Sequence, residues 1–137
     1  METEVRDLFQ YRNLKVYQNA RSYVKLINSL LEKFPEEDML ANQLRRSSYS
    51  VPSKIAEGSG RVSHKQKQKF IESAYGCLME SLCQLEIAQD FGYIEESDMA
   101  EVEQIASEIA KMLSGWIKKL TQTDQYYNPY SMNDIKN

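Results

Sequence analysis

The chain contains few of the residues that interrupt regular structure. Its 137 residues include only 5 glycines and 3 prolines, whereas folds built from many short strands need a turn roughly every 8–12 residues. A β-sandwich or β-barrel is therefore disfavoured, and long helices are expected. Charged residues make up 27% of the chain and hydrophobic residues 42%. This composition is ordinary for one globular domain and disfavours collagen-like or disordered chains.

Cysteine and histidine are also scarce. Cys77 and Cys83 are six residues apart in a helical stretch and fall on different faces, so we expect no disulfide between them and a reducing, cytoplasmic location. His64 is the single histidine, and a di-iron bundle needs a Glu-x-x-His pair on each of two helices. We therefore expect no metal, no other cofactor, no catalytic residues and no small-molecule substrate.

Long hydrophobic runs are absent as well. No apolar segment approaches the ~20 residues that a spanning helix needs. The first residues include Glu2, Glu4, Arg6 and Asp7, which fit neither a secretory signal nor a membrane anchor. No membrane partner is expected.

Four long segments have the apolar periodicity of amphipathic helices. They cover residues 12–34, 38–58, 64–91 and 95–122. Short connections between long helices predict an all-α, antiparallel, up-down-up-down four-helix bundle that forms one domain over residues 1–122. Residues 123–137 lack the pattern and are predicted to form a flexible tail.

Pro52 lies inside the second segment. Proline removes one backbone hydrogen bond and clashes with the preceding turn, so it bends or ends a helix. We expect one kinked helix over residues 38–58, with two shorter helices broken at Val51 as the alternative.

Apolar residues exceed the needs of a single core in two places. In residues 12–34 they cover about half of the helical circumference, which is wider than the ~100° stripe that faces one core. In residues 64–91 a second stripe, Met79, Cys83 and Ile87, runs on the far side from the core-facing residues. Exposed apolar patches mark interaction surfaces. We therefore expect a homo-oligomer with Met79, Cys83 and Ile87 at the subunit interface.

Charge is distributed unevenly. Residues 45–69 carry seven basic residues and one acid, a net charge of +6, whereas residues 70–110 carry ten acids and no lysine or arginine, a net charge of −10. The whole chain carries only −3. Basic ends of one subunit can meet acidic flanks of the next, or the basic residues can contact phosphates. A sequence pI of 5.3 argues against a dedicated, strongly basic RNA-binding protein.

The candidates for nucleic-acid contact come from the basic segment. They are Arg45, Arg46, Arg61, Lys65, Lys67 and Lys69. Lys65, Lys67 and Lys69 point in different directions around one helix, so Arg61 with Lys65 is the stronger pair. The loop at 58–61 can also be interpreted as a phosphate-binding turn at a helix start. It lacks the Lys-Ser or Lys-Thr ending of a P-loop and follows a helix, so a structural turn is favoured.

Glu57 is a carboxylate in the last turn of a predicted helix, where the helix dipole disfavours negative charge. Arg61 is its predicted partner in a structural ion pair. Arg45 or Arg46, reached across a contact, is the alternative partner.

Several motifs resemble a known family. They are Gln43-Leu44-Arg45-Arg46, Ile55-Ala56-Glu57-Gly58 followed by Gly60-Arg61, then Ala74, Gly76, Leu78, Glu80, Gln84-Leu85 and Gly92-Tyr93, preceded by Leu14, Val16, Tyr17, Ala20 and Phe34-Pro35. In order and spacing over about residues 12–120, they resemble the four-helix-bundle family first recognised in intervening sequences of bacterial 23S ribosomal RNA genes. Departures from residues common in that family are modest, at Ser47, Ser48, Lys54 and Cys77.

The resemblance implies a homo-oligomeric, typically pentameric, ring of bundles in a family whose members mostly lack a demonstrated function. A relative is the accessory variability determinant of diversity-generating retroelements, which partners a reverse transcriptase and binds nucleic acid through a basic surface. Our leading hypothesis is a cytoplasmic, non-enzymatic, self-assembling scaffold or adaptor. The alternative is an RNA-binding accessory protein associated with ribosomal RNA or a reverse transcriptase.

Overall fold

The computed structural model describes residues 8–127, and this part of the chain is built from helices without a β-strand. The elements are η1 (Gln10–Asn13), α2 (Lys15–Leu30), η2 (Leu31–Lys33), α3 (Met39–Ser59), α4 (His64–Asp90) and α5 (Glu96–Tyr127). The all-α prediction and its four long helices are confirmed. No helix in residues 8–127 combines the length and the hydropathy needed to cross a bilayer.

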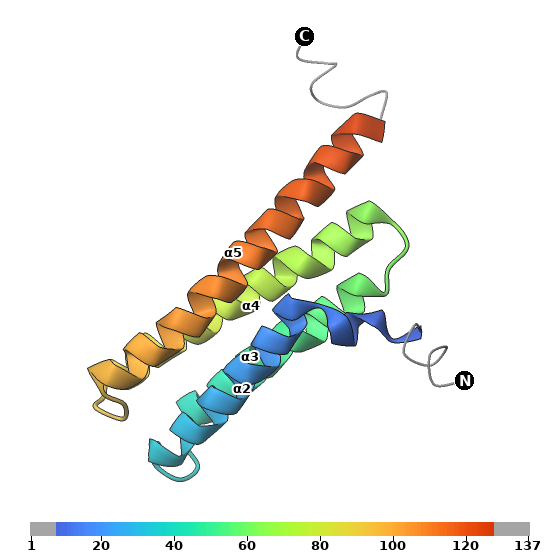
Figure 1. Ribbon diagram of the computed structural model, residues 1–137. Helices are drawn as coiled ribbons and strands as arrows, with labels where there is room; N and C mark the ends of the chain where they lie inside the picture. The colour runs from blue at the N-terminus through green and yellow to red at the C-terminus, as the bar shows by residue number, and fades with distance from the viewer. Residues whose placement is uncertain (1–7, 128–137) are drawn as a thin grey trace.

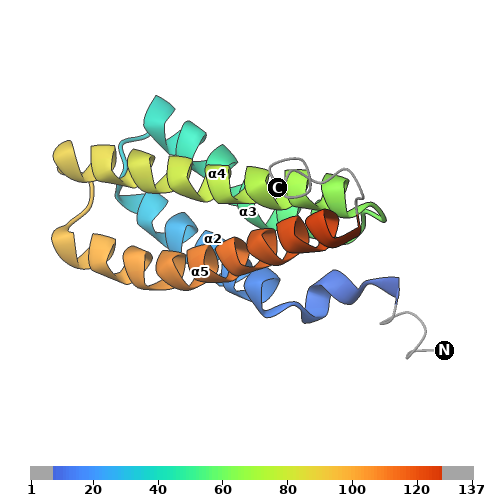
Figure 2. The same ribbon diagram turned by 90° about the horizontal axis from the view of Figure 1, so that it is seen from above.

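The helices enclose one core. Neighbouring helices pack as α2 with α3, α3 with α4, α4 with α5, and α5 with α2, so α2 and α4 lie diagonally opposite each other (Figures 1 and 2). Figure 1 shows the connections at 31–38 and 91–95 at one end of the bundle and the connection at 60–63 at the other. We call the end of the bundle that carries the 60–63 connection the loop end.

The helix boundaries follow local chemistry. Asp38 caps α3 by accepting hydrogen bonds from the backbone N–H groups of Leu40 and Ala41, at 2.8 and 3.2 Å. Ser63 caps α4 by accepting one from the backbone N–H of Gln66 at 3.3 Å. These side chains satisfy amide groups that a helix leaves without partners at its start. The first long helix is shorter than the predicted 12–34, since α2 covers Lys15–Leu30, η2 ends at Lys33 and Phe34 is already extended before Pro35.

Pro52 does not divide the second helix. The helix α3 is continuous from Met39 to Ser59 with Pro52 inside it, so the alternative of two helices broken at Val51 is wrong. Serine hydroxyls near the proline bond to carbonyl groups of earlier residues in the same helix: Ser48 donates to the carbonyl of Arg45 at 3.1 Å, and Ser53 donates to that of Tyr49 at 3.1 Å. The kink at Pro52 stays a prediction.

The last helix is longer than predicted. It continues to Tyr127, five residues beyond the expected end at 122. None of residues 123–127 is glycine or proline, so nothing in the backbone chemistry ends the helix once the apolar pattern stops. The rest of the predicted tail, 128–137, and the first seven residues lie outside the described part of the chain.

Candidate functional site

Three of the six predicted basic residues line two hollows on either side of the start of α4: Arg61 and Lys69 line one, and Lys67 lines the other. The first is an open hollow of about 370 Å³. Its lining consists of Lys54, Arg61, Gln66, Lys69, Phe70 and Ser73. We call it the Phe70 hollow. It brings three cations together and has no carboxylate in its lining.

The ring of Phe70 organises these cations. The guanidinium carbon of Arg61 lies 4.6 Å from the centroid of the ring, and Nζ of Lys54 lies 5.5 Å from it. Both distances are within the range of cation–π attraction. Because three positive charges line the Phe70 hollow and no carboxylate does, the hollow has the chemistry to hold an anion such as a phosphate.

A close approach of α3 to α4 places Phe70 there. Gly58 is buried, and a Cβ atom added to it would lie 2.9 Å from Cδ1 of Ile71 and 3.0 Å from Cβ of Phe70. The absence of a side chain at Gly58 thus sets the spacing of the two helices beside the hollow. Gly58 therefore has a structural role at this contact, and the interpretation of residues 58–61 as a phosphate-binding turn stays a prediction.

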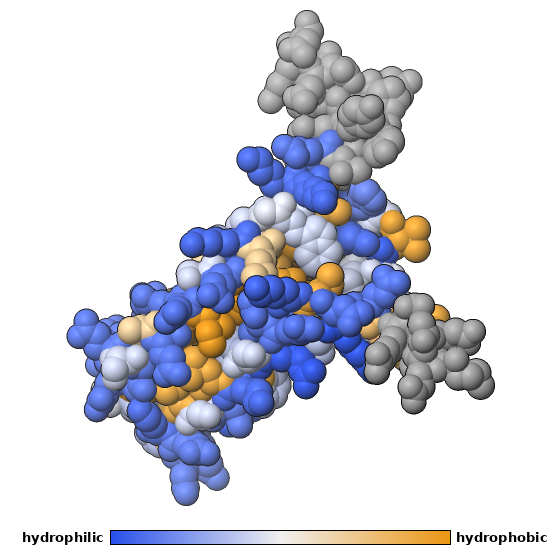
Figure 3. Space-filling model, in the orientation of Figure 1, coloured by the Kyte–Doolittle hydropathy of each residue, from blue (hydrophilic) through white to orange (hydrophobic). Residues whose placement is uncertain are grey.

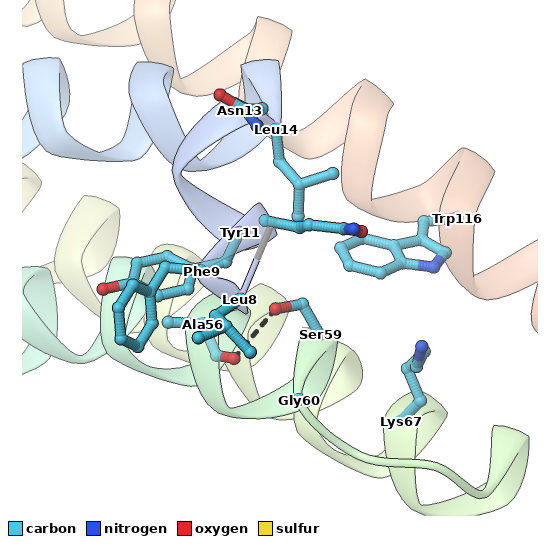
Figure 4. Close-up of a pocket in the computed structure, with 11 residues that line it drawn as sticks. Leu8, Phe9, Tyr11, Asn13, Leu14, Ala56, Ser59, Gly60, Lys67 and Trp116 are labelled. Atoms are coloured by element: carbon cyan, nitrogen blue, oxygen red, sulfur yellow. Dashed lines mark hydrogen bonds between the residues drawn. The ribbon is translucent and has the colours of Figure 1, made fainter. Parts of the chain in front are cut away.

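Lys67 lies on the other side of α4, in a larger open hollow of about 810 Å³ formed by η1, the end of α3 and α5 (Figure 4). Three aromatic side chains line it: Phe9 and Tyr11 from the N-terminal segment and Trp116 from α5. We call it the Trp116 hollow. Arg12 lies next to it, with its guanidinium carbon 4.8 Å from the centroid of the Phe9 ring.

The remaining basic candidates line neither hollow. Arg45 donates to Oδ1 of Asn42 at 3.1 Å on the surface of α3. Arg46 lines a separate polar hollow together with Glu80. Lys65 is exposed and lines none of these hollows. The pair judged stronger from the sequence, Arg61 with Lys65, therefore does not share a hollow, and Lys54 and Lys69 accompany Arg61 instead.

The Glu57–Arg61 ion pair is absent from the single chain. Between side chains of residues 8–122, the one ion pair joins Lys33 to Asp98 at 2.8 Å. Arg61 lies over the ring of Phe70 instead. The Arg61 guanidinium gains a cation–π contact with this ring beside the short α3–α4 connection. Glu57 stays exposed to solvent, so its carboxylate is hydrated without an arginine partner.

The predicted interface residues are on the outside of α4. Met79 is 38% exposed and Ile87 is 37% exposed, and Cys83 is exposed between them. Phe91, 62% exposed, extends the same four-residue spacing. We call these four residues the α4 stripe. The sequence reasoning missed Phe91 because it was counted only as the end of the helix, although the repeat of four residues continues to it.

A second apolar surface lies between α2 and α5. Nδ2 of Asn19 contacts Sδ of Met112 at 3.9 Å, and the half-buried residues Leu26 and Ile105 lie seven positions, or two turns, from these on the same faces. Figure 3 shows an apolar band along this seam, flanked by polar side chains. We call Leu26, Ile105 and Met112 the α2–α5 seam.

Both thiols are free. Cys77 is half-buried, and burial raises the pKa of its thiol, whereas Cys83 is exposed in the α4 stripe. In the described ranges no group of three His, Cys, Asp or Glu side chains is placed to hold a metal ion. The site thus offers cations, aromatic faces and apolar surfaces.

The model of the family described as "23S rRNA-intervening sequence protein" matches residues 12–115. The chain belongs to this family. The match includes α2, α3 and α4 and most of α5, together with the whole Phe70 hollow and the α4 stripe. The family description states no reaction and no ligand. No curated protein matches the chain.

Proposed function

We propose that the protein is a non-enzymatic, self-assembling scaffold or adaptor that acts in the cytoplasm. Each unit is an up-down-up-down bundle with a bend at Pro52, and the units form a homo-oligomeric ring, which the family resemblance suggests is pentameric. The observation that carries this proposal is the presence of two apolar surfaces, the α4 stripe and the α2–α5 seam, on different sides of one bundle.

Two different surfaces on one subunit favour a ring. A contact between the α4 stripe of one copy and the α2–α5 seam of the next is head-to-tail, and such contacts close into rings when the rotation between copies allows. The two surfaces belong to different helices, because the stripe lies along α4 and the seam joins α5 to α2, which is diagonal to α4. A stripe and a seam on one side would favour a two-fold dimer instead.

Burial and charge both support association. Complete burial of an apolar side chain stabilises by about 1.5–3 kcal/mol, so covering the exposed parts of Met79 and Ile87 contributes roughly 1 kcal/mol each. The α4 stripe lies within the acidic part of the chain, 70–110, whereas residues 12–31, which include the α2 side of the seam, carry four basic residues and no acid. Neighbouring copies can therefore present opposite charges to each other.

The test places charge in the α4 stripe. We expect Met79→Glu with Ile87→Glu to convert the oligomer to monomers at micromolar concentration while the helix content is retained, because a buried unpaired carboxylate opposes association. Light scattering measures the mass and circular dichroism measures the helix content.

The matched control adds two carboxylates to an exposed face of α5, as Ser107→Glu with Ser114→Glu. This control should keep the wild-type mass. A Met79→Glu, Ile87→Glu variant with the mass of the wild-type oligomer would contradict the proposed interface.

An RNA-binding accessory protein is the second candidate function, and the Phe70 hollow is the observation that favours it. If Lys54, Arg61 and Lys69 contact phosphates, the logarithm of the binding constant for RNA falls linearly with the logarithm of the salt concentration. The magnitude of this slope is about 0.7 for each phosphate contacted on a single strand. We expect Arg61→Gln with Lys69→Gln to reduce this slope by about 1.4 without changing the oligomer.

The control for the RNA test removes the same charge from Arg45 and Arg46, which lie outside both hollows. Arg45→Gln with Arg46→Gln should change the slope much less. Fluorescence anisotropy of a labelled RNA over a series of salt concentrations gives the slopes. Equal slopes for the wild type and the Arg61→Gln, Lys69→Gln variant would exclude the Phe70 hollow as the phosphate site.

A further inference from the structure

The Trp116 hollow combines two properties that self-assembly through the α4 stripe and the α2–α5 seam does not use. Its walls are rich in aromatic rings, and none of its lining residues is Asp or Glu. Figure 4 shows Trp116 on one side, Phe9 and Tyr11 on the other, and Lys67 reaching up from α4 toward the space below the indole. A planar ring with a nearby negative charge matches this combination.

Positive charges near the Trp116 hollow also fit a ligand that carries phosphates. Lys67 lines the hollow and Arg12 lies 4.8 Å from the ring of Phe9. On the opposite side of α4, Arg61 and Lys69 line the Phe70 hollow. The two hollows are thus separated by about one helix diameter, ~10–12 Å, which corresponds to roughly three nucleotides at the 3.4 Å rise of a stacked strand.

We infer that the Trp116 hollow receives an unpaired base of single-stranded RNA, stacked on the indole of Trp116, with Lys67 holding an adjacent phosphate. This inference rests on the second candidate function and specifies its ligand. A duplex keeps its base faces stacked against each other and cannot present one to Trp116. An acidic peptide would satisfy Lys67 and Arg12 but leave the aromatic walls without a planar partner.

The tryptophan itself reports on the hollow, because Trp116 is the only tryptophan in the chain. The full-length protein is titrated with a single-stranded adenine-rich RNA of about 12 nucleotides while indole fluorescence and the anisotropy of a labelled RNA are both followed. We expect quenching that saturates together with the anisotropy. An RNA duplex of the same length and a poly-glutamate peptide serve as probes without available base faces.

Substitutions separate stacking from charge. Trp116→Leu should weaken binding of the single strand by at least about fivefold, whereas Trp116→Phe, which keeps an aromatic face, should stay within about twofold of the wild type. Lys67→Gln should weaken binding and lower the salt slope, whereas Lys25→Gln, an exposed lysine on α2, should not. Because Trp116 also packs against the core, Tyr11→Leu gives a second test at a half-buried wall residue, with circular dichroism as the folding check.

Each outcome decides one claim. Anisotropy that shows RNA binding without a change in indole fluorescence would overturn the inference and leave the RNA-binding candidate intact. Equal quenching by the duplex or by poly-glutamate would also overturn it. Absence of RNA binding by anisotropy at low salt would reject the inference together with the RNA-binding candidate.

Discussion

The hydroxyl group of Tyr23 lies in the centre of the bundle, far from solvent. Its oxygen is 2.6 Å from Oγ of Ser81, and that hydroxyl in turn donates to the carbonyl of Leu78 at 2.7 Å. Since the Ser81 proton is engaged by the carbonyl, Tyr23 is the donor to Ser81. Both residues have no exposed surface, and burial raises the pKa of Tyr23 to about 12.

This buried phenol predicts a loss of stability at high pH. An unfolded tyrosine titrates near pH 10, so above that pH the unfolded state releases its proton while folded Tyr23 keeps it. The free energy of unfolding should be fully retained below pH 10 and should fall by roughly 2–3 kcal/mol as the pH rises toward 12. Urea unfolding of the wild type and of Tyr23→Phe isolates this contribution, because the other titrating groups cancel in the difference.

The stability of the Tyr23→Phe variant should therefore decline less steeply between pH 10 and 12. Parallel curves for the two proteins would mean that the phenol is not held in its protonated form by burial.

Sequence reasoning reached part of this residue-scale detail. Tyr23 belongs to the wide apolar face of residues 12–34, and it is buried, as a position on that face predicts. The partner Ser81 could not be predicted from the sequence. Which residue of α4 faces Tyr23 depends on how α2 and α4 are oriented in the bundle, and the pattern of a single helix does not determine this. The Arg61 side chain shows the same difficulty. Its sequence distance from Glu57 suits an ion pair, but the ring that Arg61 contacts comes from another helix.

At the scale of helices, the contact of α3 with α4 depends on glycine. Gly58 and Gly76 are both helical, but Gly58 meets Ile71 and Phe70 while Gly76 has nothing within 4 Å of an added Cβ atom. Identical substitutions at the two positions therefore test close packing separately from helix propensity.

We expect Gly58→Ala to lower the free energy of unfolding by about 1–2 kcal/mol, because overpacking outweighs the gain in helix propensity. Gly76→Ala should raise it by about 0.5–1 kcal/mol. Denaturant unfolding measures both. A stabilised Gly58→Ala variant would show that α3 and α4 separate without cost, and the placement of Phe70 would then need another explanation.

The positions of the helices were largely predictable from apolar periodicity and helix stop signals. The predicted ranges of the second and third helices differ from α3 and α4 by one residue at most. The continuity of α3 through Pro52 was predicted only as the preferred of two alternatives, because proline at one position is compatible with either outcome. The end of α5 was missed because polar residues continue a helix without leaving an apolar pattern.

For the whole molecule, the sequence predicted an uneven charge and an excess of apolar surface but not their arrangement. Helical wheels place residues around one helix, whereas the two hollows form where residues of different helices meet. Lys54 and Trp116 were therefore not recognised as parts of a site. Three of the four members of the α4 stripe were recognised because they belong to one helix, and the α2–α5 seam was not, because it joins two helices.

Self-association of the bundle is the central claim, and the mass of the wild-type protein in solution tests it most directly. Sedimentation velocity at micromolar concentration and moderate salt should show a single species several times heavier than the 16.0 kDa chain. A five-membered ring would have a mass of about 80 kDa. A wild-type species of 16.0 kDa under these conditions would contradict the claim.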